Sequence, residues 1–197
     1  MEHWTALVEL LGPPSHSADP GVWDAVESEL GVCFPADYRQ FIESYAPVRL
    51  NGHLHFTHPA HAVWDLKKWA SVTLEAYQGL DWVDLTPPEF KSDDPRFGGP
   101  DGLVPLVESD RGECVFFQAG ETSRMYVYVG SDDDFYRYDM TFSEWLYRYL
   151  RGEEMTGPNS SVFSSGPVRF DALPGAEGGR GAFWFGPTDL SRPYSSP

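Results

Sequence analysis

The stretch from Val22 to Tyr45 constrains the fold most strongly, because two helical patterns follow each other across a very short connection. Apolar residues recur at helical spacing in both patterns, so each helix has one apolar face. Gly31 suits the left-handed end of the first helix, and Pro35 suits the first turn of the second. The stretch therefore predicts a helical corner that the rest of the chain packs into. Its two stripes are Trp23, Val26 and Leu30, then Tyr38, Phe41, Ile42 and Tyr45.

Other helices are predicted before and after this corner. Residues 4–11 predict an opening helix, and residues 62–78 predict a longer one with Leu66, Trp69, Thr73, Tyr77 and Leu80 on its inner face. Thr141 and Glu144 have the spacing of a capping box, which predicts a closing helix near residues 141–151.

The sequence between the predicted helices contains segments with the pattern of strands. Asn51-Gly52 between two short apolar runs favours a hairpin with a type I′ turn. Four further runs, separated by polar turns, favour an antiparallel meander; they are residues 103–107, 113–118, 125–130 and 135–138. The predicted fold class is α+β, with N-terminal helices packed on a mainly antiparallel sheet.

The corner resembles the signature of the SUKH superfamily, which includes immunity proteins and fungal cell-wall regulators. The resemblance lies in Leu30-Gly31 at a helix end, Phe34-Pro35 at the connection, and Tyr38 and Phe41 in the next helix. Residues 102–106 and 109–113 look like the central hairpin of that family, and residues 142–146 look like the start of its last helix. The resemblance spans about residues 20 to 152, and the acidic loop from Asp81 to Gly102 has no counterpart in it.

Composition changes after the closing helix. Residues 1–156 are predicted to form a single SUKH-like α+β domain, and residues 157–197 form an extension rich in Gly, Pro and Ser. Two apolar islands in the extension, PVRFDAL and GAFWF, flank a glycine-rich turn. They predict an appended C-terminal hairpin, because the Phe-Trp-Phe run is too apolar to stay exposed.

The chain is strongly acidic, with 30 Asp and Glu against 14 Lys and Arg and a formal net charge of −16. Such a field disfavours nucleic acid and anionic membranes and attracts basic proteins, although acidity also serves solubility alone. The predicted partner-binding residues are Asp81, Trp82, Asp84, Asp93, Asp94, Asp132, Asp133 and Asp134. Trp82 is open to two interpretations, a lid over the core or an anchor in an interface.

Several observations bear on the compartment. Cys33 and Cys114 are too few for a disulfide framework, and both lie in apolar stretches that predict buried free thiols. The start of the chain lacks the basic and apolar regions of a signal peptide. No apolar run approaches the roughly 20 residues that a membrane-spanning helix needs. We expect a cytoplasmic protein.

The histidines His53, His55, His58 and His61 form the most enzyme-like pattern. Residues at i and i+2 of a strand point the same way, so His53 and His55 could share a metal ion. The alternative, which we favour, is histidines on an exposed strand face. Asp132 to Asp134 lacks the glycine and distal glutamate of a calcium loop and favours a tight turn. No known catalytic motif is present, and we predict no catalytic residue, no cofactor and no metal.

These observations and the resemblance together imply a non-enzymatic immunity protein that binds a cognate, basic toxin of a bacterial toxin–immunity system. Two alternatives stay open. One is an intracellular regulatory or scaffolding module with the same fold, and the other is a metal-dependent hydrolase that uses the histidine cluster.

Overall fold

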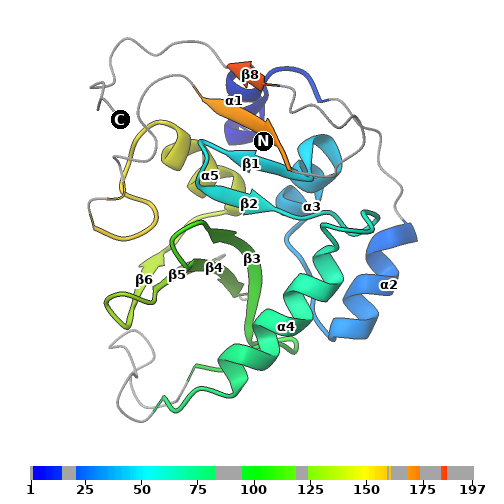
Figure 1. Cartoon of the computed structure of the whole chain (residues 1–197), viewed down its shortest axis with the longest axis vertical. Coiled ribbons are helices and arrows are strands. Elements are labelled where there is room, and N and C mark those ends of the chain that lie inside the picture. The colour runs from blue at the N-terminus through cyan, green and yellow to red at the C-terminus, as the bar shows by residue number, and fades with distance from the viewer. Residues whose placement is uncertain are drawn as a thin grey trace.

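The computed structural model describes residues 2–14, 21–82, 95–118, 124–158, 160, 168–173 and 183–185. Within these residues the chain forms five helices and eight strands (Figure 1). The helices are α1 (Glu2–Leu11), α2 (Gly21–Leu30), α3 (Ala36–Tyr45), α4 (Leu66–Gln78) and α5 (Phe142–Leu150). The strands are β1 (Val48–Leu50), β2 (Leu54–Phe56), β3 (Leu103–Ser109), β4 (Glu113–Gln118), β5 (Arg124–Val129), β6 (Asp134–Tyr138), β7 (Arg169–Ala172) and β8 (Phe183–Phe185). None of the helices in this part of the chain is long and apolar enough to cross a membrane.

The described strands form one sheet in the order β6-β5-β4-β3-β2-β1-β7-β8. Every neighbouring pair is antiparallel, so the predicted α+β class and the predicted meander of β3 to β6 are confirmed. A register shift between Pro105 and Val107 interrupts the pairing of β3 with β4. Figure 1 shows α4 running beside α2 and next to β3.

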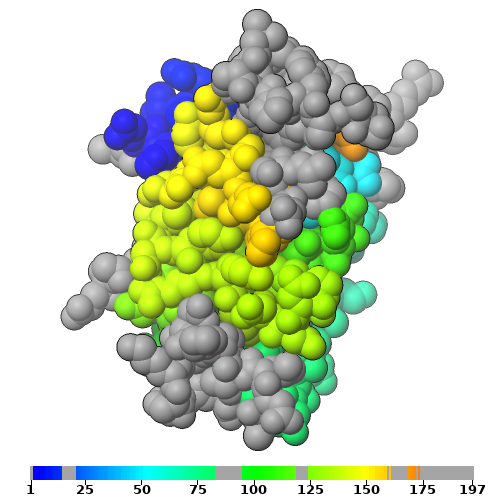
Figure 2. All heavy atoms as spheres, turned by 90° about the vertical axis from the view of Figure 1, so that its left-hand side faces the viewer, coloured from blue at the N-terminus to red at the C-terminus, as the bar shows by residue number. Residues whose placement is uncertain are grey.

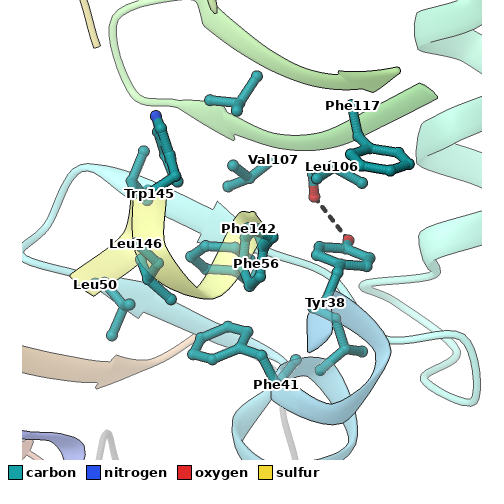
Figure 3. Close-up of a cluster of buried hydrophobic side chains, with 14 of the residues drawn as sticks. Tyr38, Phe41, Leu50, Phe56, Leu106, Val107, Phe117, Phe142, Trp145 and Leu146 are labelled. Carbon is teal, nitrogen blue, oxygen red and sulfur yellow. Dashed lines mark hydrogen bonds between the residues drawn. The ribbon is translucent and has the colours of Figure 1, made fainter. Parts of the chain in front are cut away.

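Both faces of the central strands are buried. Along β4, Val115 and Phe117 belong to the main core, whereas Cys114 and Phe116 belong to a second core on the opposite face. Helices α1, α2, α3 and α5 contribute to the main core, and Figure 3 shows how the rings of α3 and α5 meet that of Phe56 on β2 there. Helix α4 and the residues that follow it cover the second core.

The helical corner forms as predicted, with two differences in detail. Gly31 has the left-handed φ of +63°, but Pro35 occupies the N-cap of α3, one position before the helix begins. In the extended connection Val32 and Phe34 point into the core, so Cys33 between them points out. The prediction of a buried thiol is therefore wrong for Cys33, because alternate residues of an extended segment face opposite sides.

Helix α4 begins later than the predicted residue 62. The side chain of Asp65 caps it by accepting hydrogen bonds from the backbone N–H groups of Lys67 and Lys68, at 2.8 and 3.2 Å. Leu66 of the predicted stripe is fully buried, and Trp69 and Tyr77 are partly buried against the two cores. Ala70 and Leu74 are also buried, although the stripe does not include them, and Leu80 is 42% exposed.

The predicted C-terminal hairpin is confirmed, and it extends the main sheet. Strand β7 pairs with β8 on one side and with β1 on the other, with Arg49 of β1 opposite Asp171 of β7. Asp171 is buried and lies 3.5 Å from the guanidinium of Arg49 and 3.1 Å from that of Arg169. The paired charges offset the cost of burying this carboxylate at the β1–β7 contact.

Candidate functional site

The predicted acidic residues lie at two places in the described chain. Asp81 is exposed just after α4. Asp132 and Asp133 are exposed in the turn between β5 and β6, and Asp134 begins β6. The other three predicted aspartates, Asp84, Asp93 and Asp94, lie outside the described residues.

Trp82 belongs to the second core and is only 6% exposed. Its indole N–H donates a hydrogen bond of 3.0 Å to the carbonyl oxygen of Tyr77. Its ring lies 5.4 Å from that of Phe97 and 5.6 Å from that of Phe135. The tryptophan is therefore a lid over the core, the first of the two interpretations.

Trp82 also connects the two acidic places. Its ring lies 5.9 Å from that of Tyr128, whose hydroxyl donates a 2.8 Å hydrogen bond to Oδ1 of Asp133. Burial, and then the Asp133 carboxylate, raise the pKa of Tyr128 to about 12, so the phenol keeps its proton at neutral pH. The end of α4 and the β5–β6 turn are thus held together on one side of the sheet.

A further acidic residue that we did not predict, Asp110, lies at the same end. It lies in the β3–β4 turn, and half of its side chain is exposed. The two turns are adjacent, because a Cβ placed on Gly130 would lie 3.9 Å from the carbonyl oxygen of Gly112. Alternate turns of an antiparallel meander share one end of a sheet, so the sequence did contain this signal. We call this set the acidic surface: Asp81, Asp110, Asp132, Asp133 and Asp134.

Behind the acidic surface lies a buried polar network around His53, which is 1% exposed. Its Nδ1 is 2.9 Å from the hydroxyl of Tyr149 on α5, and its Nε2 is 3.6 Å from Oε2 of Glu113. The hydroxyl of Ser109 donates to the same glutamate oxygen. This network joins the β1–β2 turn, the β3–β4 hairpin and α5.

Glu113 is ionised within this network. Burial alone would raise its pKa, but the nearby His53 imidazole and hydrogen bonds from Ser109 and its own backbone N–H lower the pKa to about 2. Because Ser109 donates its proton to Glu113, its hydroxyl is not arranged to pass that proton to an imidazole. His53, Ser109 and Glu113 are all less than 9% exposed, so the network has the character of a structural core.

The remaining histidines of the cluster have separate local roles. Nδ1 of His58 accepts a hydrogen bond from the backbone N–H of Ala60, and Nδ1 of His61 accepts from Val63 and Trp64. The pKa of His55 is lowered by burial and then by the charge of Arg49. In the described part of the chain, no three His, Cys, Asp or Glu side chains are grouped to hold a metal ion.

The fold and these motifs define a protein of the SUKH class. The family model described as SMI1-KNR4 cell-wall, SUKH_6, matches residues 22–146. This match covers more than half of the chain, and the chain belongs to the SUKH superfamily. It includes the helical corner, the central hairpin and the beginning of α5. Searches of curated proteins and of solved structures gave no match.

Proposed function

We propose that this protein is an immunity protein that binds and neutralises a basic protein toxin through its acidic surface. The family match supports the immunity or regulatory class. The observation that supports the choice of partner is the set of carboxylates in the β3–β4 turn, in the β5–β6 turn and after the end of α4, on a chain with a net charge of −16. The proposal is non-enzymatic: the protein acts by occupying the toxin surface.

The physical basis is electrostatic attraction between unlike surfaces. A toxin that cleaves nucleic acid needs a basic groove to hold its substrate. An acidic protein is steered to such a groove, and association reaches roughly 10⁸ M⁻¹s⁻¹ at low salt when the potentials are complementary. Because Tyr128 holds Asp133 from the core side, part of this surface is fixed before the partner arrives, which lowers the entropy lost on binding.

A growth-rescue assay tests the proposal. Each protein encoded beside the gene for this chain is expressed alone and together with the chain in the same cytoplasm. We expect one neighbour to stop growth alone and to form a stable complex when both are present. If no neighbour is toxic, or if rescue occurs without a complex, the immunity proposal is wrong. Capture of a non-toxic cellular protein in the same cells would support the regulatory alternative instead.

A further inference from the structure

We propose that the β6 edge of the sheet is the place where the partner adds a strand, which deepens the proposed function and rests on it for the basic character of the partner. Strand β6 ends the sheet order and pairs with β5 on its other side only, among the described strands. The edge has an open groove of about 510 Å³, whose described lining is Tyr136, Arg137, Tyr138 and Asp139. Figure 2 shows this part of the chain, in yellow-green, on the face turned to the viewer.

Within the described residues, β6 contains no proline, bulge or lysine that would prevent strand addition. Natural edges are commonly blocked by proline, by a bulge or by an outward lysine. The sequence of β6, Asp-Phe-Tyr-Arg-Tyr, contains no proline, and its five residues pair with β5 in unbroken register. Its one cation, Arg137, makes two-pronged hydrogen bonds of 2.7 and 2.9 Å to the carboxylate of Asp139, so its charge is offset within the hairpin.

The groove has two different walls. On one side the rings of Tyr136 and Tyr138 pack on the main core. The Tyr138 hydroxyl donates a 3.2 Å bond to the carbonyl of Glu154, and a Cβ on Gly157 would lie 3.5 Å from the Tyr136 ring. On the other side lies the Arg137–Asp139 pair. An incoming strand therefore meets supported aromatic rings on one face and the Arg137–Asp139 ion pair on the other.

The negative charge around β6 indicates which kind of strand can bind at this edge. Residues 130–139 contain four aspartates and one arginine, a net charge of −3. Three of the aspartates lie before or at the start of β6, and Asp139 follows its end. A second copy of this chain would bring the same negative charge against itself, whereas a strand with alternating basic and apolar residues is complementary. We therefore assign the edge to a basic, extended segment of a partner protein, bound by β-augmentation.

The first test uses a short synthetic peptide of alternating lysine and valine, with an alternating glutamate and valine peptide as its control. Backbone amide hydrogen exchange is measured on the full chain with each peptide. We expect the basic peptide to slow exchange of alternate amides within residues 134–138 and the acidic peptide to leave them unchanged. Protection at β8 instead, no protection at β6, or protection that grows with protein concentration alone would overturn the assignment; the last result would indicate self-association.

The second test uses matched variants at neighbouring positions, Tyr136→Pro against Tyr136→Ala and Arg137→Pro against Arg137→Ala. In an antiparallel strand the N–H groups alternate in direction, so one proline removes a bond to β5 and the other removes only an outward N–H. Thermal unfolding identifies the residue whose N–H points away from β5. At that residue the proline variant and the alanine variant unfold at the same midpoint temperature. There we expect proline to weaken peptide binding roughly tenfold relative to alanine. Equal binding by the two variants would overturn the proposal.

The peptide tests and the growth-rescue assay fail separately. If the peptide binds β6 but no neighbour is toxic, the edge assignment holds and the immunity function falls. If a toxin is found and its complex leaves the β6 amides exchanging as in the free protein, the immunity function holds and the edge assignment is wrong.

Discussion

The carboxylate of Asp37, in the first turn of α3, accepts a hydrogen bond of 2.7 Å from the backbone N–H of Ser143 at the start of α5. The two residues are 106 positions apart. At the same helix start, the side chain of Thr141 accepts from the N–H of Glu144. The first turn of α5 is therefore held partly by its own cap and partly by α3, which ties the helical corner to the closing helix.

Replacing Asp37 is expected to loosen this tie. Asp37→Ala leaves the Ser143 N–H without its acceptor and should lower the free energy of unfolding by about 1 kcal/mol or more. Asp37→Asn keeps an acceptor oxygen and should cost less. Urea denaturation of both variants checks the prediction, and equal losses for the two would show that charge, not the hydrogen bond, is what matters at this position.

Tyr38 makes another long-range hydrogen bond of the corner. Its hydroxyl donates a 2.7 Å bond to the buried carbonyl of Leu106 on β3 (Figure 3). Tyr38→Phe keeps the ring and leaves that carbonyl without its donor, so it should cost about 1–2 kcal/mol of unfolding free energy. Tyr147→Phe removes a hydroxyl from a partly exposed tyrosine of α5 and serves as control. The prediction fails if both variants unfold at the same urea concentration.

Glu113 should make stability depend on pH in the acid range. Its folded pKa of about 2 lies below the ordinary 4.5, so the folded state favours the ionised form. The resulting stabilisation is complete above pH 4.5, and it is lost as the pH falls from 4.5 toward 2. Its upper limit is about 3.5 kcal/mol, because the pKa shift from 4.5 to about 2 is worth about 1.4 kcal/mol per unit.

Urea unfolding of the wild type and of Glu113→Gln at several pH values between 7 and 2 measures this contribution. The gap between the two proteins should be largest near neutral pH and should narrow below pH 4.5. The exposed Glu108→Gln on the same hairpin is the control. A gap that is constant over the whole range would mean that Glu113 is not the titrating group.

The acidic surface should control the rate of partner association. We expect Asp132→Asn combined with Asp133→Asn to slow association several-fold at low salt, with little change in dissociation, because steering acts before contact. Glu9→Gln combined with Asp24→Asn changes net charge equally at exposed positions on α1 and α2. Stopped-flow or surface-based kinetics at several salt concentrations compares the pairs. Equal slowing by both would assign steering to net charge alone.

Gly102 should tolerate no side chain. A Cβ at this position would overlap the backbone carbonyl oxygen of Gly98, where a turn leads into β3. Gly102→Ala is therefore expected to destabilise the protein by more than 1 kcal/mol, because backbone must move. Gly79→Ala, whose Cβ would lie 3.4 Å from the Glu75 carbonyl oxygen, is the matched control. Thermal unfolding of both variants tests this prediction. If the turn can shift without cost, Gly102→Ala will lose no more stability than Gly79→Ala.

The helices and strands followed from local patterns that act within a few residues. Tyr38, Phe41 and Ile42 share a helix face by spacing alone, and all three are fully buried. The predicted start of α4 at residue 62 is too early, because the N-cap is Asp65, whose side chain accepts hydrogen bonds from the first turn of the helix. The burial of Cys33 was wrong because its neighbours are apolar but its own side chain points the other way.

The site was less predictable, because contacts between distant residues decide it. Sequence spacing suggested that His53 and His55 could share a ligand, yet His53 is bound by Tyr149, 96 positions away. The adjacency of the acidic turns is different, because the predicted meander already implies that its alternate turns lie at the same end of the sheet. Asp110 was therefore predictable from the sequence, although it is not among the predicted residues.

Because β7 pairs with β1, the sheet edge at β1 is completed only by a strand that lies much later in the chain. β1 ends at residue 50, and the strand that covers its open side begins at residue 169. During synthesis the helical corner and the hairpin of β1 and β2 emerge long before that strand exists. The nascent chain thus carries an unpaired sheet edge at β1 until β7 has been synthesised, and an edge of this kind can pair wrongly with another strand.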